Sequence, residues 1–168
     1  MRAFYLHGYT STGLTSDKRT ALEQLELEVI APVYTYPKMQ DILPTIQKEV
    51  EDQKPDFLIG SSMGGRLAFY LANMLQLPAL LFNPALVHPL IDQYHPVPEN
   101  YQIMPFYHNQ HFTLGQQDEI VPPSGTLLFL KTSYPNQSPH YTLLPNLAHR
   151  ISSELLKQHT KAFIKQYF

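Results

Sequence analysis

The chain has no cysteine among its 168 residues. This absence excludes a disulfide framework, a cysteine nucleophile and any metal site built on thiolates. A single domain of this length buries about two thirds of the surface that its unfolded form exposes, so it needs neither disulfides nor a metal to hold it together. We therefore expect one domain spanning residues 1–168.

The sequence also has little net charge, with a formal value of −2 at pH 7. Lysines and arginines are scattered rather than gathered in a stripe, so neither nucleic acid nor an anionic membrane surface is an expected partner. No apolar run is long enough to cross a bilayer, and residues 1–8 lead into a strand pattern without the apolar core and cleavage site of a signal peptide. We expect a cytoplasmic protein, and the sequence leaves its oligomeric state open.

Short apolar runs alternate with amphipathic stretches along the chain. Six runs have the near-continuous hydrophobicity of strands covered on both faces, at residues 3–6, 29–31, 57–59, 79–82, 112–114 and 141–144. Helices are expected at residues 17–27, 41–53, 63–75, 124–132 and 152–167, the last of them capped by Ser152. This alternation predicts a doubly wound α/β fold, with a parallel sheet of about six strands and helices on both faces.

One segment breaks the alternation. Between Asn83 and Phe106 the chain carries five prolines, which exclude a long regular helix. This proline-rich segment, residues 83–106, is too short to be a second domain. We expect it to be either a small flap over the carboxyl end of the sheet, where open α/β sheets place their sites, or a surface connection.

The pentapeptide Gly60-Ser61-Ser62-Met63-Gly64 follows an expected strand and opens an expected helix. A Gly-x-Ser-x-Gly pattern in this setting is typical of a nucleophile elbow, where small residues let the strand, the turn and the helix approach closely. Outside such a setting the same string is only a glycine-rich loop whose serine caps a helix. We interpret Ser62 as a candidate nucleophile for acyl chemistry.

A serine hydroxyl needs a base to take its proton, usually a histidine that a carboxylate holds in one tautomer. In a fold with a nucleophile elbow, the acid and then the histidine follow the serine in sequence, each in a loop just past a strand. The loop after the fifth expected strand offers Asp118, with Glu119 as the alternative, and the loop after the sixth offers His149. The other seven histidines lack this placement and form no metal-binding pattern. We predict a triad of Ser62, Asp118 and His149.

Attack on a carbonyl creates an oxyanion, which backbone N–H groups must face. We expect one donor in Met63, directly after the nucleophile at the positive end of a helix. The loop after the first strand supplies the other, which we assign to Tyr9 with Thr10 as the alternative. We expect His7 to brace this loop through side-chain hydrogen bonds rather than to act as a base, and His7 and Gly8 to border the substrate.

Taken together, these motifs resemble the small bacterial YqiA-type esterases of the α/β-hydrolase superfamily. The matching blocks span most of the chain: Tyr5-Leu6-His7-Gly8-Tyr9, Gly60-Ser61-Ser62-Met63-Gly64-Gly65, Asn83-Pro84-Ala85-Leu86, Asp118-Glu119-Ile120-Val121 and His149. The resemblance implies a compact hydrolase with a parallel sheet, no cofactor, the same three catalytic residues, and small-molecule esters with short acyl chains as substrates. It also implies that Asn83 and Pro84 border the site.

The chain departs from the family pattern at three places. Arg66 stands where an aromatic residue is usual, residues 146–148 replace a glycine-rich approach to the histidine, and the acid loop at 115–118 is one residue longer. These departures bear on the substrate pocket rather than on the triad. We expect Arg66 either to form a salt bridge on the helix surface or to reach a substrate carboxylate.

Two classes of alternative function share these features. A thioesterase, an amidase or an acyltransferase would use the same triad, because one oxyanion intermediate serves them all. A non-catalytic binding module would keep the fold and use the aromatic residues of the proline-rich segment instead.

Overall fold

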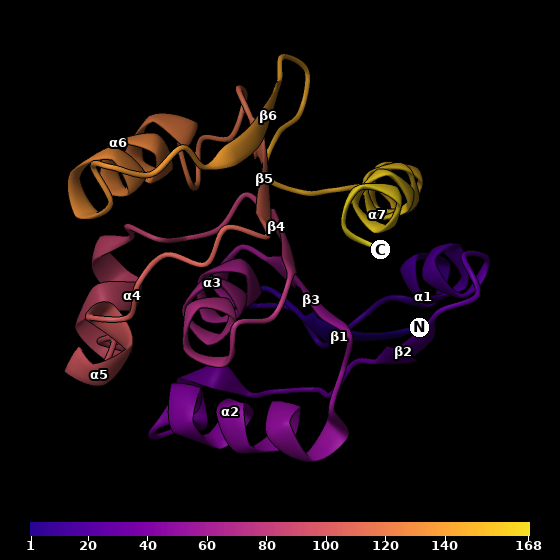
Figure 1. Ribbon diagram of the computed structural model, residues 1–168, viewed down its shortest axis with the longest axis horizontal. Helices are drawn as coiled ribbons and strands as arrows, with labels where there is room; N and C mark the ends of the chain where they lie inside the picture. The colour runs from indigo at the N-terminus through magenta and orange to yellow at the C-terminus, as the bar shows by residue number, and fades with distance from the viewer.

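Six parallel strands form one sheet in the order β2-β1-β3-β4-β5-β6 (Figure 1). The structure, a computed structural model, describes residues 1–168. The strands are β1 Arg2–Leu6, β2 Glu28–Ile30, β3 Phe57–Ser61, β4 Ala79–Phe82, β5 Gln110–Gly115 and β6 His140–Leu144. The chain runs from β1 outward to β2 and then returns to the other side of β1 with β3. The switch point of the sheet therefore lies between β1 and β3, where open α/β sheets bind their ligands.

Helices cover both faces of the sheet, with α1 and α7 on one face and α2, α3 and α6 on the other (Figure 1). Their bounds are α1 Ser16–Glu23, α2 Ile42–Gln53, α3 Met63–Leu75, α6 Pro123–Ser133 and α7 Ser153–Tyr167, with a 3-10 turn, η1 Tyr36–Lys38, before α2. The side chain of Ser152 caps α7 as predicted, because its Oγ accepts a hydrogen bond of 3.1 Å from the N–H of Leu155. The predicted doubly wound α/β fold is confirmed.

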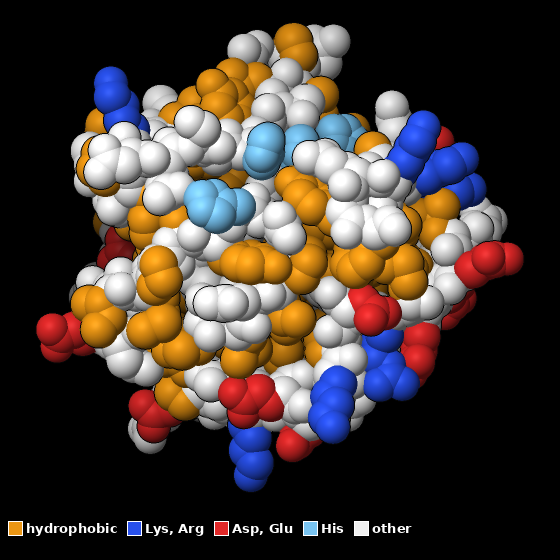
Figure 2. Space-filling model, viewed as in Figure 1, with side chains coloured by type: hydrophobic (Ala, Val, Ile, Leu, Met, Phe, Trp, Pro, Cys, Tyr) orange, Lys and Arg blue, Asp and Glu red, His pale blue; other side chains and the backbone are white.

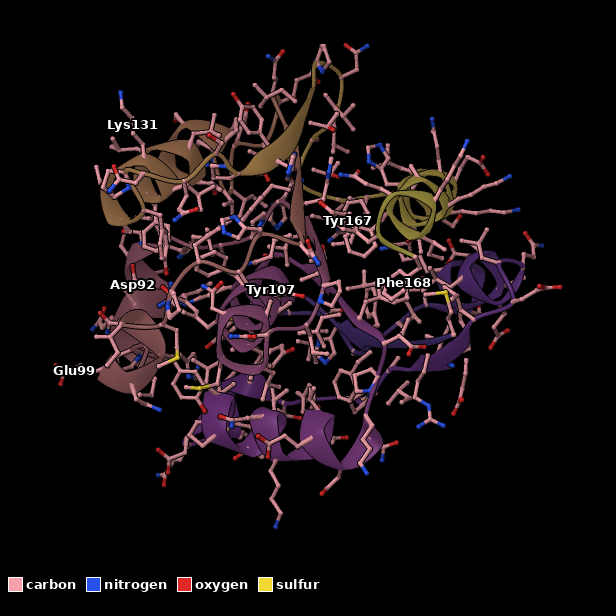
Figure 3. The ribbon with its side chains drawn as sticks, in the orientation of Figure 1. Asp92, Glu99, Tyr107, Lys131, Tyr167 and Phe168 are labelled. Carbon is pink, nitrogen blue, oxygen red and sulfur yellow. The ribbon has the colours of Figure 1, made fainter.

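The strands direct alternate side chains into two hydrophobic cores. In β3, Leu58 packs with α2, α3 and α6, whereas Phe57 and Ile59 pack with α1 and α7. The first core holds 27 buried residues and the second 11, so most of the stabilising apolar burial lies on the side of α3. Figure 3 labels Tyr167 and Phe168 at the end of α7, and the ring of Phe168 lies 5.8 Å from that of Phe57 between centroids.

The proline-rich segment forms two short helices, α4 Pro89–Tyr94 and α5 Glu99–Gln102, which lie outside α3 (Figure 1). The predicted absence of a long helix is confirmed. Pro89 occupies the first turn of α4, where its missing N–H costs nothing. Six apolar side chains of the segment join the larger core, which holds the segment against α3: Ala85, Leu86, Ile91, Val97, Tyr101 and Phe106.

The charged side chains of the face shown in Figure 2 stand mainly at its rim, with acidic and basic groups in mixed order. Neither sign forms a continuous patch on this face. None of the helices has the length and hydrophobicity that crossing a membrane requires.

Candidate active site

Ser62 lies on the turn between β3 and α3, in a backbone conformation that few residues adopt. Its φ is 56° and its ψ is −118°. Three backbone hydrogen bonds of 3.0 Å hold the turn: the Ser62 N–H donates to the Phe82 carbonyl, and the Ser62 carbonyl accepts from the amides of Arg66 and Ala85. Strain of this kind persists only where the surroundings fix it, and it is typical of a nucleophile elbow.

The glycines beside Ser62 make this turn possible. A Cβ at Gly64 would overlap the backbone carbonyl of Leu6 in β1, and a Cβ at Gly60 would overlap that of Gly64. A Cβ at Gly65 would lie 2.9 Å from the Cα of Pro84. The helix therefore approaches both neighbouring strands more closely than any side chain allows, as the motif predicts.

The structure brings the three predicted triad residues together. His149 Nε2 lies 3.1 Å from Ser62 Oγ, and His149 Nδ1 lies 2.7 Å from Asp118 Oδ2. The three side chains come from the loops after β3, β5 and β6, which meet at the carboxyl edge of the sheet. This geometry favours the tautomer in which Nδ1–H donates to the carboxylate and Nε2 accepts from the serine hydroxyl. The arrangement can take a proton from Ser62 and stabilise the resulting imidazolium.

Asp118 rather than Glu119 is the carboxylate in contact with the imidazole. The Asp118 side chain is fully buried, and its Oδ1 accepts hydrogen bonds of 2.9 and 2.8 Å from the amides of Ile120 and Val121. Glu119 is exposed. One oxygen of Asp118 is thus fixed by the backbone while the other is left for His149.

Asn83 ties the acid and histidine loops together from beneath the site. Its Oδ1 accepts a hydrogen bond of 2.8 Å from the amide of Gly115, and its Nδ2 donates to the carbonyls of Ala148 and His149, both at 3.0 Å. Asn83 is buried and has a φ of 43°, a conformation that asparagine tolerates better than most residues. The sequence places Asn83 near the site but gives no sign of this bridging contact.

His7 braces the loop after β1, as predicted. Its Nδ1 donates to the Gly8 carbonyl at 2.8 Å, and its Nε2 accepts from the Tyr34 amide at 2.9 Å. The imidazole is buried and lies beside the ring of Tyr36, with 4.8 Å between centroids. Burial lowers the pKa of His7, and the bond to Gly8 opposes this shift only in part. His7 therefore serves as a neutral brace.

A cavity of about 580 Å³ opens beside Ser62 and His149. Of the four residues predicted to border the substrate, Gly8 lines this cavity, while His7, Asn83 and Pro84 do not. The side chains of His7 and Asn83 are buried and form the hydrogen bonds described above. The Pro84 carbonyl accepts a hydrogen bond of 3.2 Å from the Thr126 hydroxyl. These three residues shape the loops around the cavity instead of forming its wall.

The amides of both predicted oxyanion donors lack a backbone partner. Met63 is the first residue of α3, so its N–H has no acceptor within the helix. Tyr9 lines the cavity with Thr10, and neither of their amides donates to another backbone group. The Tyr9 ring is held at its far end, where its hydroxyl lies 3.3 Å from Nε2 of His95.

Arg66 forms a salt bridge, one of its two expected roles, but it is buried rather than on the helix surface. Its residue surface is only 3% exposed, because α3 is covered on all sides. The guanidinium forms an ion pair of 2.7 Å with Asp92 of α4 and donates to the carbonyls of Ala85 and Leu86 at 3.3 and 3.0 Å. Figure 3 places Asp92 on α4, at the outer side of the molecule. Arg66 therefore anchors the proline-rich segment to α3 and does not line the cavity at Ser62.

A second cavity of about 360 Å³ lies between α2, α3 and α4. Met63, Leu43 and Leu67 give it an apolar wall, and Tyr94 and His95 close it on the side of α4. No residue lines both cavities, and the contact of Tyr9 with His95 joins a residue of the first to a residue of the second. The structure has no group of three or more His, Asp or Glu side chains placed to hold a metal ion.

The model of an uncharacterised protein family, UPF0227, matches residues 2–133. Among curated proteins, no sequence matches the chain significantly.

Solved structures of low sequence identity share the fold. Est1E from Butyrivibrio proteoclasticus is 18% identical, with a TM-score of 0.74 over 98% of this chain and 87% of that one. The ydeN gene product from B. subtilis is 14% identical, with a TM-score of 0.70 over 98% of both chains. XC6422 from Xanthomonas campestris, described as a member of a/b serine hydrolase without lid, is 18% identical, with a TM-score of 0.69 over 99% of this chain and 82% of that one. At such identities the likeness establishes the fold alone.

Proposed function

We propose that this chain, which belongs to the family UPF0227, is a serine hydrolase of short-chain carboxylic esters. The family model matches most of its length, and the side chains of a serine, a histidine and an aspartate are in contact. The family membership confirms the resemblance that the sequence motifs predicted. The observation that carries the proposal is the line of contacts from Ser62 Oγ through His149 to Asp118, at 3.1 and 2.7 Å.

The first half of the reaction acylates the serine. His149 Nε2 takes the proton of Ser62 as Oγ attacks the ester carbonyl, and the amides of Met63 and Tyr9 stabilise the oxyanion that forms. The intermediate collapses, the bond to the alcohol oxygen breaks, and that oxygen takes the proton from His149. The alcohol leaves and an acyl-Ser62 ester remains.

The second half hydrolyses this ester with the same groups. His149 takes a proton from water, the hydroxide attacks the acyl carbonyl, and the serine oxygen recovers its proton as the acid leaves. Asp118 stays ionised and holds the imidazole in one tautomer throughout.

The two cavities support a short acyl chain. Tyr9 lines the cavity at Ser62 and contacts His95, which lines the second cavity, and no residue lines both. We infer that this contact separates an acyl group bound at Ser62 from the second cavity. We propose acetyl and butyryl esters as better substrates than long-chain esters. XC6422, which has the same fold, is described as a serine hydrolase without lid.

Two adjacent serines provide the test of the nucleophile. We expect Ser62→Ala to lower kcat/KM for 4-nitrophenyl acetate by at least about 10³-fold, because the nucleophile of a triad cannot be replaced by its neighbours. Ser61→Ala, the matched control, should stay within about twofold of the wild type. Circular dichroism melting of both variants checks that they fold. Equal hydrolysis by wild type and Ser62→Ala would overturn the assignment.

A substrate series tests the acyl-chain limit. For the wild type we expect kcat/KM to fall from 4-nitrophenyl butyrate to the octanoate. In His95→Ala, which removes the contact with Tyr9, we expect the octanoate to acetate ratio to rise by about 10-fold, because the added apolar volume accepts more methylene groups. His108→Ala removes an exposed histidine as the control. A wild type that prefers the octanoate would contradict the short-chain assignment.

A further inference from the structure

The cavity at Ser62 has a polar and cationic wall as well as an apolar one. The loop of residues 9–13 contributes the hydroxyls of Thr10 and Thr12, and Lys18 of α1 and Arg150 contribute positive charges. No aspartate or glutamate lines the cavity. Its fixed charge is therefore positive, although the chain as a whole carries −2.

Neither of these two cations has an ionic partner in the protein. The structure contains four ion pairs, and Lys18 and Arg150 take part in none of them. Asp17, which neighbours Lys18 in sequence, does not line the cavity. Two positive side chains thus share one cavity without a carboxylate between them.

The environment of Lys18 shows that the two charges act on each other. Lys18 is half-buried, and burial lowers the pKa of its amine. The negative charge of Asp17 opposes this shift, and the positive charge of Arg150 adds to it to a smaller extent. An anion in the cavity would relieve this repulsion, and arginine and lysine are the side chains that bind carboxylates and phosphates.

The reaction itself locates this wall relative to the substrate. The alcohol oxygen of the ester takes its proton from His149 Nε2, so the alcohol part must lie on the side of His149. Arg150 directly follows His149 and lines the same cavity. We therefore assign the cationic wall to the alcohol part of a bound ester rather than to the end of its acyl chain.

We propose that the natural substrate carries an anionic group, a carboxylate or a phosphate, on its alcohol part, and that Lys18 and Arg150 bind this group while Ser62 attacks the ester. This inference rests on the proposed function. It narrows the substrate class from short-chain esters in general to acyl esters of acidic alcohols.

Paired substrates test the inference. One pair is 4-acetoxybenzoate and its neutral methyl ester, and 4-acetoxyphenyl phosphate replaces the carboxylate by a phosphate. For Lys18→Gln and Arg150→Gln we expect the ratio of kcat/KM for anionic over neutral ester to fall about 5-fold or more each, and further in the double variant. Whichever anionic ester, the carboxylate or the phosphate, shows the larger fall in this ratio carries the group that Lys18 and Arg150 bind better. Lys161→Gln, which removes an exposed lysine of α7, is the control and should leave the ratio unchanged.

A second pair places the charge on the acyl part instead. The ratio of 4-nitrophenyl hemisuccinate to 4-nitrophenyl butyrate should respond less to the same variants. A larger response of this ratio would overturn the placement on the alcohol side, and an unchanged 4-acetoxybenzoate ratio in the double variant would overturn the anion site itself.

A binding measurement separates this inference from the proposed function. Calorimetry of 4-hydroxybenzoate with Ser62→Ala needs no turnover, and we expect weaker binding when Lys18→Gln and Arg150→Gln are added. If the wild type hydrolyses neutral esters through Ser62 but the cationic side chains affect neither ratio nor binding, only the anion site is wrong. If no ester is hydrolysed while 4-hydroxybenzoate still binds through Lys18 and Arg150, the proposed function fails and the anion site stands.

Discussion

The loops that carry the triad and the outer helices α4 and α5 are held in place by different means. In the triad loops, each reactive side chain is bonded to a neighbour that is itself fixed: His149 to Asp118, and Asp118 to two backbone amides. Asn83 then joins the histidine and acid loops through three further bonds. Several separate hydrogen bonds thus fix the relative positions of the triad side chains.

The helices α4 and α5 depend on fewer specific contacts. The buried Arg66 holds Asp92 of α4, and the Tyr101 hydroxyl donates to Gln47 of α2 at 2.6 Å. Large apolar side chains of this region stay exposed, among them Leu90 and Ile103 at 60% and 68%. Several interlocking contacts therefore fix the triad, whereas few specific contacts hold α4 and α5, so we expect changes in these helices to disturb the triad little.

The largest effect should come from the triad loops. We expect Asp118→Asn to lower kcat/KM for 4-nitrophenyl acetate by about 10³- to 10⁴-fold, because an amide favours the wrong imidazole tautomer and cannot stabilise the imidazolium. Glu119→Gln, at the adjacent exposed position, should change the rate little. Steady-state kinetics at pH 7.5 measure both. If Asp118→Asn kept a tenth of the wild-type kcat/KM, the contact of Asp118 with His149 would not be essential to the reaction.

A smaller effect, on stability rather than on the triad, should follow from releasing α4. In Arg66→Met the aliphatic stem is kept, but the ion pair and the bonds to two buried carbonyls are lost. We expect the free energy of unfolding to fall by about 1–3 kcal/mol, less than for a fully buried pair because the Asp92 side chain is 46% exposed.

Thermal melting and 4-nitrophenyl acetate hydrolysis together check this variant. We expect a fall in Tm of roughly 2–4 °C for each kcal/mol lost. The rate on the acetate should change far less than in Asp118→Asn. Lys131→Met, at an exposed site on α6 that Figure 3 labels, is the control. A loss of activity as large as that of Asp118→Asn would show that α4 and α5 also govern the triad.

The smallest effect should appear in the pH dependence of stability. Burial lowers the pKa of His7 in the loop after β1 and of His95 at the end of α4, and it also lowers that of His111 in β5 and His159 in α7. Since these groups bind protons more weakly in the folded chain, the unfolded chain takes up more protons once the pH falls below about 6.5. Their contribution to stability is therefore complete above that pH and is lost as the pH falls through the folded pKa values.

Melting curves between pH 8 and pH 5 test this sign. We expect Tm to fall on acidification below pH 6.5, with a shallower fall in His159→Gln than in His108→Gln, which changes an exposed histidine. A Tm that rises between pH 6.5 and pH 5 would contradict the stated direction.

The sequence predicted the fold because each element has a local signature. The six apolar runs, the glycines around Ser62 and the cap at Ser152 depend on neighbours a few residues away, and the structure matches them. The order of Ser62, Asp118 and His149 after β3, β5 and β6 also follows from local patterns, because parallel strands bring their carboxyl ends to one edge.

The contacts that the sequence did not reveal join distant parts of the chain. The bond from Asn83 to His149 spans 66 residues, and that from Tyr9 to His95 spans 86. The salt bridge of Arg66 was expected on the helix surface and is buried instead, because a charged residue on a helix usually faces solvent and only the packing of α4 over α3 covers this one. The residue type indicates which groups a side chain can form hydrogen bonds with, and the tertiary fold determines which of those groups lie within reach.

The central claim is that Ser62 is the activated nucleophile, and a fluorophosphonate probe tests it most directly. We expect mass spectrometry of the labelled, digested protein to find one adduct, on Ser62, with no adduct on Ser61 and none in Ser62→Ala or after heat denaturation. Labelling of another residue, or folded wild-type protein that stays unlabelled while an established serine hydrolase reacts beside it, would contradict the account.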